Sequence, residues 1–322
     1  MRESAFVKQN KDKWLTFESL VQNNISISPS EVSNIYVELT EDLNYAQTFY
    51  PESETLAYLN ELSVAAHQKI YKSKKESKNR IFQFYLKEFP LFFYHHRSTL
   101  LLAFILFLSF SILGAYSASE DDGFVRLILG DAYVNKTLSN IQKGDPMAIY
   151  KEANQTDMFL GITINNIKVA LFAFVAGLLA GLGTIYILLQ NAIMLGSFQY
   201  FFYDQGLLWE STRTIWIHGA IEISVIIVAS CAGLVTGKSL LFPGTYTRLD
   251  AFTKGVKSGL KIVISTIPFF IIAGFLEGFV TRLTGMPDWL AVFIISASFI
   301  LIIYYYVILP QIIYTNHAKQ LH

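Results

Sequence analysis

The chain has few of the residues that soluble proteins use for cross-linking and catalysis. One of its 322 residues is cysteine, which excludes a disulfide framework, a structural zinc site made of cysteines and an iron–sulfur cluster held by one chain. Charged residues make up 16%, against about 25% in a typical soluble domain. The chain has 25 basic residues (lysine and arginine) and 25 acidic residues (aspartate and glutamate). It therefore has no net positive charge that would attract nucleic acid.

Apolar residues dominate instead. The hydrophobic share is 52% and the mean hydropathy is +0.39. The soluble segments contain no phosphate-binding glycine loop, nucleophile elbow or dinucleotide fingerprint. These features predict an all-α, polytopic helical membrane protein rather than a soluble enzyme.

The first 97 residues carry as many basic as acidic side chains and no run long enough to cross a bilayer. Apolar residues recur there at helical spacing. They predict one helix over about 3–21, a second from Pro29 to a break at Tyr50-Pro51, and a third beginning near Glu52. We therefore expect residues 1–97 to form a cytoplasmic helical domain.

Several long runs without charge follow. Residues 98–119 would form a helix of about 33 Å, enough for a hydrocarbon core of about 30 Å. The charge-free run 169–203 would be about 52 Å long as one helix and must break. We expect the break at Gln190-Asn191, near Gly196, which leaves a third crossing that is short or re-entrant. Residues 214–237, 262–281 and 289–309 supply further crossings.

Basic residues orient these crossings. The segment 238–261 holds five basic residues and one acid, which favours the cytoplasmic side. Six crossings with both termini inside follow, with an extracytoplasmic segment at 120–160, a transmembrane bundle at 161–310 and a cytoplasmic tail at 311–322. Five crossings is the rival, and it would place the basic segment 238–261 on the wrong side of the membrane.

Three ionisable residues interrupt the apolar crossings. His218 and Glu222 are four residues apart and share one helix face, and Glu277 lies in the next crossing. Because successive crossings run antiparallel, all three are expected in the same leaflet. Ionisable groups inside a membrane are costly and usually face the bundle interior. His218, Glu222 and Glu277 therefore predict a proton relay, an ion or substrate site, or a metal centre. The alternative is a polar clamp that fixes helix packing. Whether this intramembrane polar cluster binds a metal is left open.

Small and amide residues mark a neighbouring crossing. Gly177, Gly181 and Gly183 form a small-residue stripe that predicts close helix packing within the monomer and leaves homo-oligomerisation open. Asn165, Asn166 and Asn191 are expected at the ends of this crossing, where their side chains would bind freed backbone groups.

A basic amphipathic helix is predicted over 245–261. Apolar residues share one of its faces, and four basic residues lie mostly elsewhere: Arg248, Lys254, Lys257 and Lys261. This pattern is typical of a helix lying on an anionic lipid surface.

The sequence resembles the stage II sporulation protein M family of bacterial and archaeal membrane proteins over nearly its whole length. The matching motifs in the first domain are Phe6-Val7-x-x-Asn10 with Trp14, Asp42-Leu43, Phe49-Tyr50-Pro51, Tyr58-Leu59-Asn60, Ala66-His67 and Ile70-Tyr71. Those in the membrane are Asn165-Asn166, Gly177 through Thr184, and His218-Gly219-x-x-Glu222 followed by Gly233, Gly237 and Pro243. The resemblance implies an inner-membrane component without an assigned reaction, and in spore formers an anchor for peptidoglycan-degrading partners.

From these observations we expect a scaffold or assembly subunit of a cell-envelope complex in the bacterial inner membrane, with protein partners and the lipid bilayer as its contacts. We expect no enzyme activity, no catalytic residue, no cofactor and no nucleic-acid partner. A transporter or channel that uses the His218, Glu222 and Glu277 cluster is the first alternative. A metal-dependent membrane hydrolase is the second, although the His-Glu-x-x-His zinc motif is incomplete because position 222 is glutamate.

Overall fold

The computed structural model describes residues 1–22, 29–71, 79–151 and 154–320. In these ranges the chain is helical and contains no strand. It divides into two compact units, Met1–Arg80 and Ile81–His322, which are described separately.

The first unit contains three helices close to the predicted ranges: α1 (Glu3–Gln22), α2 (Pro29–Phe49) and α3 (Glu54–Tyr71). Their apolar faces form a separate core that includes Phe6, Trp14, Leu39 and Leu59. The indole Nε1 of Trp14 donates a 2.8 Å hydrogen bond to Asp42, and Lys13 pairs with the same carboxylate. A core of its own allows this unit to hold together as a domain.

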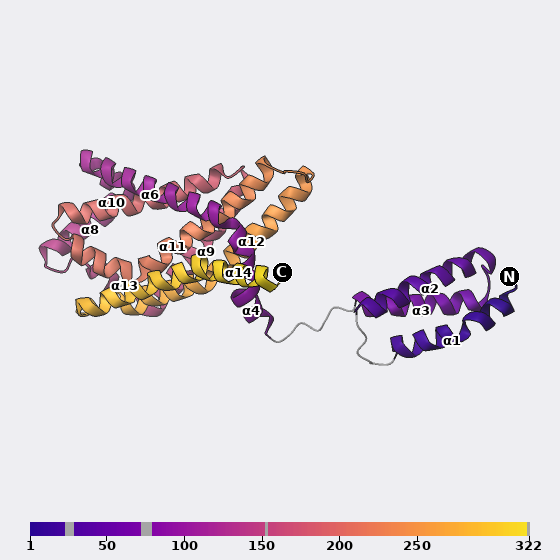
Figure 1. Ribbon diagram of the computed structural model, residues 1–322. Helices are drawn as coiled ribbons and strands as arrows, with labels where there is room; N and C mark the ends of the chain where they lie inside the picture. The colour runs from indigo at the N-terminus through magenta and orange to yellow at the C-terminus, as the bar shows by residue number, and fades with distance from the viewer. Residues whose placement is uncertain (23–28, 72–78, 152–153, 321–322) are drawn as a thin grey trace. The chain divides into compact units, whose positions relative to one another are not determined.

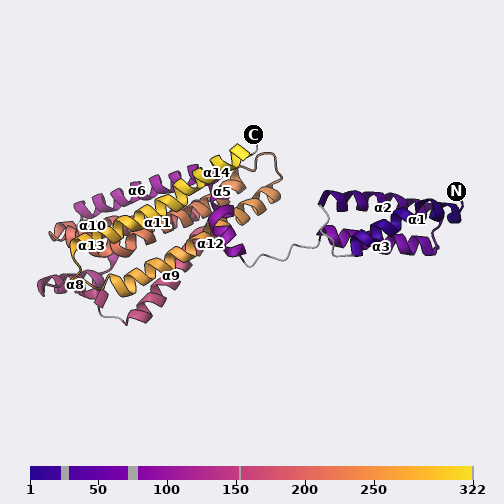
Figure 2. The ribbon, with the colours of Figure 1, turned by 60° about the horizontal axis from the view of Figure 1, so that its bottom comes forward.

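The second unit is built mainly of long helices (Figures 1 and 2). Their bounds are α6 (Arg97–Glu120), α9 (Gln155–Val175), α10 (Leu182–Asp204), α11 (Leu208–Leu241), α12 (Arg248–Phe275) and α13 (Asp288–Ile303). Shorter helices lead in or connect them: α4 (Arg80–Gln83), α5 (Phe89–Phe93), α7 (Asp122–Leu129), α8 (Asp131–Gln142) and α14 (Leu309–Gln320). Brief 3-10 or π turns are η1 (Phe84–Glu88), η2 (Tyr94–His96), η3 (Ala148–Lys151), η4 (Ala176–Leu178), η5 (Leu276–Val280) and η6 (Tyr304–Ile308).

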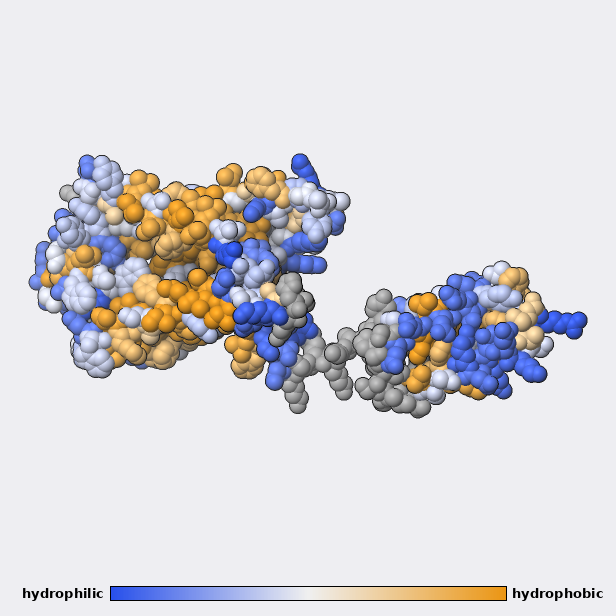
Figure 3. All heavy atoms as spheres, viewed as in Figure 1, coloured by the Kyte–Doolittle hydropathy of each residue, from blue (hydrophilic) through white to orange (hydrophobic). Residues whose placement is uncertain are grey.

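Six helical stretches in the described residues are long and apolar enough to cross a membrane. Hydrophobic side chains cover the middle of this unit in the view of Figure 3, whereas hydrophilic side chains gather toward its two ends. This band is what a hydrocarbon environment requires. The predicted polytopic helical membrane fold is confirmed.

The unit begins and ends on the same side. The rings of Tyr94 and Tyr314 stack with centroids 3.9 Å apart. The end of α14 lies opposite α8 in both ribbon views, together with α4 in Figure 1 and α5 in Figure 2. A chain that enters and leaves at one end crosses an even number of times. Six crossings therefore fit the structure, and five do not.

Helix α11 is the central element. Its most apolar stretch is 83% buried, whereas the corresponding stretches of the other five candidate crossings are between 17% and 50% buried. Helices α6, α9, α10, α12 and α13 all contact it. A residue on α11 is therefore shielded from lipid by protein on most sides.

The predicted break in the run 169–203 is wrong in position. The chain turns at Ala176–Gly181, where Gly181 has φ +85°, and α10 then continues as a full helix of 23 residues. The third crossing is therefore neither short nor re-entrant. The Gln190-Asn191 pair stays helical because both amides find partners within α10: Gln190 bonds to Tyr186 and Asn191 to the Ile187 carbonyl.

The basic segment 245–261 is not a separate surface helix. It forms the first turns of α12, which continues without interruption to Phe275. Gly255 and Gly259 are buried, and a Cβ atom at either position would clash with α11. These close contacts explain why the segment packs along α11 instead of lying apart from the bundle.

Two other predicted boundaries differ from the structure. The division between units lies at Arg80, before the predicted residue 97, because Phe89 and Phe93 pack in the core of the second unit. The predicted tail 311–322 belongs largely to α14, which contacts α5, and residues 321–322 lie outside the described ranges. The predicted extracytoplasmic segment 120–160 contains α7, α8 and the first turn of α9.

Candidate functional site

The three ionisable residues of the membrane crossings converge on one place. His218 and Glu222 lie one turn apart on α11, and Glu277 lies in the π turn η5 that follows α12. One ligand atom from each residue lies within 4.8 Å of the other two. The structure thus brings the three predicted residues together.

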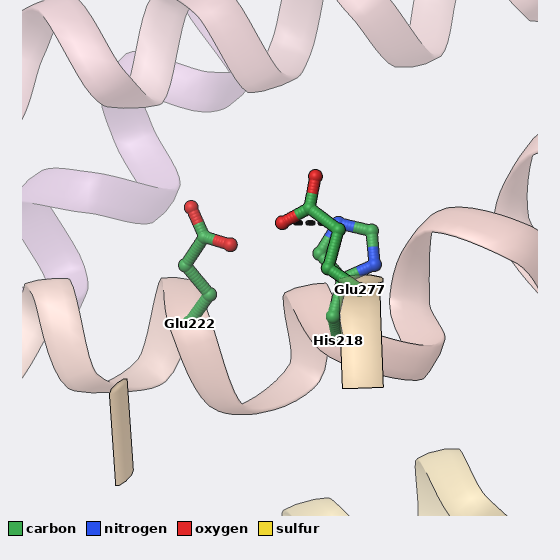
Figure 4. A group of neighbouring side chains, drawn as sticks. All are labelled: His218, Glu222 and Glu277. Carbon is green, nitrogen blue, oxygen red and sulfur yellow. Dashed lines mark ion pairs between the residues drawn. The ribbon is translucent and has the colours of Figure 1, made fainter. Parts of the chain in front are cut away.

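Figure 4 shows how these side chains meet. His218 and Glu222 project from the same face of α11, and the carboxylate of Glu277 points into the space between them. His218 Nε2 lies 3.7 Å from Glu277 Oε2, and the two side chains are 7% and 12% exposed. The cluster is therefore largely withdrawn from both lipid and bulk water.

Thr281 fixes the histidine ring. Its hydroxyl lies 3.0 Å from His218 Nδ1, so this ring nitrogen is engaged on the side away from the acids. When Nδ1 carries the proton and donates it to Thr281, Nε2 presents its lone pair toward Glu277. The π turn that carries Glu277 is a kind of helix irregularity often found at functional sites.

Helix α9 places two buried polar side chains, Asn166 and Thr163, near the cluster. Asn166 is 5% exposed and its side chain lies beside the Glu222 carboxylate, yet its Nδ2 atom makes no hydrogen bond of normal geometry to any described residue. Thr163, one turn away, also has a buried hydroxyl without a partner in the described ranges. It faces Gly274, where a Cβ atom would clash with that hydroxyl. Glycine at 274 therefore lets α9 and α12 approach beside the cluster.

A cavity of about 300 Å³ adjoins the cluster. His218 and Glu222 line it together with other residues of α11, and apolar residues of α7, α8 and α10 also line it, including Leu129, Tyr133 and Phe198. The cavity therefore lies between the cluster and these three helices.

The other predicted site residues do not join the cluster. Asn165 is exposed on the far side of α9, and Asn191 lies within α10. Asn165, Asn166 and Asn191 therefore do not mark the ends of one crossing, because the chain turns at Ala176–Gly181, between α9 and α10.

The predicted glycine stripe contributes to packing, but its residues do not lie on one face of a single helix. Gly177 and Gly181 belong to the turn between α9 and α10, and Gly183 opens α10. A Cβ atom at Gly177 would clash with the backbone of Gly233 on α11. Close packing inside the monomer is thus the structural role of these residues.

The predicted basic residues lie on the exposed side of α12. Arg248, Lys254, Lys257 and Lys261 are all exposed. The Lys254 ammonium lies 3.3 Å from the ring centroid of Tyr246, and that of Lys261 lies 5.1 Å from the centroid of Phe92. These cations lie at the end of the unit opposite the cluster, since α12 ends beside Glu277.

Sequence reasoning did not select Thr281 or Thr163. Thr281 follows Glu277 by four residues, a spacing that places both on one helix face, so this signal was present. Thr163 and Asn166 are likewise three residues apart on α9. Their contribution depends on the depth of α9 against α11, which no local pattern specifies.

Comparison with known proteins identifies two regions. The stage II sporulation protein M family matches residues 103–282, which include all three residues of the cluster. A family described only as a domain of unknown function (DUF8413) matches residues 4–72. No curated protein and no solved structure is detectably similar to the chain.

Proposed function

This chain belongs to the stage II sporulation protein M family, and from that premise we propose that it works as a membrane-embedded scaffold or assembly subunit of a cell-envelope complex. The proposal assigns it no reaction and no catalytic residue. It places the protein in the bacterial inner membrane with both termini in the cytoplasm.

The observation that carries the proposal is the separate amino-terminal unit. Its three helices have their own core, so the unit needs no contact with the bundle to bury its apolar faces. It nevertheless exposes large apolar side chains, among them Val37 (55% exposed) and Val64 (47% exposed). An independent domain with exposed apolar side chains, joined to a membrane anchor, suits a protein that holds a partner at the membrane surface.

The basic first turns of α12 support the orientation. The start of α12, which carries Arg248, Lys254 and Lys257, lies at the same end of the unit as α4 and the end of α14 (Figure 1). Short cytoplasmic loops carry an excess of lysine and arginine. The proposed orientation therefore has both ends of the second unit in the cytoplasm.

Co-purification tests the proposal. The full chain is isolated from native membranes in mild detergent, and proteins that accompany it in stoichiometric amounts are identified. A Val37→Glu/Val64→Glu variant should lose a partner that docks on the first unit, whereas Gln47→Glu, an exposed polar position on α2, should retain it. A wild-type chain that always emerges alone would contradict the scaffold function.

Transport is a second candidate, favoured by the cavity beside His218 and Glu222. A polar cluster that opens into a membrane cavity is a common feature of ion pathways. Purified protein in liposomes should then show cation or proton flux that Glu222→Gln abolishes and that Glu120→Gln, at an exposed helix end, leaves unchanged. Flux equal to that of empty liposomes would remove this candidate.

A further inference from the structure

We propose that His218, Glu222 and Glu277 bind one divalent transition-metal cation between α9, α11 and α12. The inference is independent of the scaffold function, since it rests on the geometry of the cluster alone. The three side chains come from two different crossings and present their ligand atoms to one space (Figure 4).

Charge balance is the first argument. Two carboxylates held close together in a poorly solvated site repel each other strongly, and a buried charge without a partner is costly. In the described part of the chain neither carboxylate pairs with a lysine or arginine; the ion-pair partner within reach is His218. Arg213 precedes His218 on the same helix, α11. Its guanidinium donates hydrogen bonds to the Asp288 carboxylate and to the carbonyls of Thr284 and Met286 instead. A divalent cation would cancel both negative charges at once.

The donor set selects the kind of cation. Imidazole nitrogen with carboxylate oxygen suits zinc, manganese or iron, whereas magnesium and calcium prefer oxygen alone. The Thr281 hydroxyl holds Nδ1 of His218 at 3.0 Å, which leaves Nε2 directed at the acids. An outer hydrogen bond that fixes the ring in this way is the usual companion of a metal-binding histidine.

The distances are close to those of a metal site. A tetrahedral cation with ligands at about 2.1 Å has its ligand atoms about 3.4 Å apart. The His218–Glu277 separation is 3.7 Å, and the widest separation of the three ligand atoms is within 4.8 Å. Glu222 lines the adjoining cavity, so on this proposal its side chain rotates to bring the carboxylate onto the cation.

Asn166 is the independent observation that points to a ligand. Its side chain is 5% exposed, lies beside Glu222, and has a buried Nδ2 atom that makes no hydrogen bond of normal geometry in the described ranges. A buried amide normally satisfies its polar atoms. A half-turn about χ2 exchanges the amide nitrogen and oxygen, so Asn166 can offer Oδ1 to a cation or Nδ2 to a water molecule that the cation holds.

Metal binding to the purified full-length protein tests the proposal. The protein carries a purification tag without histidine, is exchanged into metal-free detergent buffer, and is titrated with Zn²⁺, Mn²⁺ or Mg²⁺. We expect one Zn²⁺ per chain, weaker binding of Mn²⁺, following the usual order of affinities, and no saturable binding of Mg²⁺. Glu222→Gln and Glu277→Gln, which keep the side-chain shape but remove the charge, should each weaken Zn²⁺ binding at least about 100-fold, more than the loss of an outer-shell partner.

Two exposed residues supply matched controls. His317→Gln and Glu120→Gln remove the same chemical groups at exposed positions and should bind Zn²⁺ as the wild type does. Absence of stoichiometric Zn²⁺ in the folded wild type overturns the proposal, and so does full retention of Zn²⁺ by both cluster variants. If a cluster variant does not fold, X-ray absorption of the zinc-loaded wild type decides: a first shell with imidazole and carboxylate supports the site, and a shell without imidazole refutes it.

Discussion

Replacing Gly233 with alanine tests the packing that joins α9, α10 and α11. Gly233 lies on the central helix, and a Cβ atom there would clash with the Ala173 carbonyl and with Thr184. The Thr184 hydroxyl is itself bonded to that carbonyl at 2.7 Å. Neither obstacle is the mobile end of a flexible side chain, so the added methyl group has to push backbone apart.

The expected size of the effect follows from two opposing terms. Overpacking a tight interior costs about 1–3 kcal/mol, whereas alanine is favoured over glycine in a helix by about 1 kcal/mol. Gly233→Ala should therefore destabilise the bundle by up to about 2 kcal/mol. For a unit of this size each kcal/mol shifts the melting temperature by about 2–4 °C.

Gly161→Ala is the matched control. Gly161 lies within α9, and a Cβ atom at this position meets nothing within 4 Å, so only the favourable helix term remains. Thermal unfolding in one detergent should place Gly161→Ala at or above the wild type and Gly233→Ala below it. Equal melting temperatures for the two variants would refute the claim that close backbone contact at Gly233 holds these helices together.

Two further predictions concern topology and the first unit. The native Cys231 is buried and should not react with a membrane-impermeant thiol reagent. The reagent should therefore label Lys143→Cys in intact cells. It should label Thr245→Cys only after the cells are permeabilised. Asp42→Ala should destabilise the first unit by about 1–3 kcal/mol, because the Trp14 N–H would stay buried without its acceptor. Asp42→Asn keeps an acceptor and should destabilise the unit less. Hydrogen exchange of the α1–α3 amides measures both free energies of unfolding.

Much of the fold was predictable because a bilayer imposes simple lengths. A crossing needs about 20 apolar residues, so a charge-free run such as 98–119 locates a helix directly. The run 169–203 failed as a guide because the turn inside it is made of small apolar residues, Ala176 to Gly181. The polar residues Gln190 and Asn191 drew the predicted break to the wrong place, since their amides are satisfied inside a helix.

The candidate site was predictable to the extent that helix geometry alone fixes it. A spacing of four residues puts His218 and Glu222 on one face, and antiparallel crossings bring Glu277 to the same depth. The contribution of Asn166 was misassigned because the sequence does not reveal which face of α9 meets α11, or at what depth. Such lateral packing depends on contacts between glycines and distant backbone, as at Gly274 and Thr163.

Helix α11 is held at two places by different chemistry. Near Gly233 the contacts involve backbone and the Thr184 side chain but no ionisable group. Near Glu222 they are between polar side chains that are buried or half-buried. The two places are eleven residues, or about 16 Å, apart along the helix, far enough for their contributions to stability to add. Zinc at about 100 times its dissociation constant would raise the unfolding free energy by about 2.7 kcal/mol. This increment should be lost in Glu222→Gln and kept in Gly233→Ala, so that metal acts on one end of α11 while the glycine contacts hold the other.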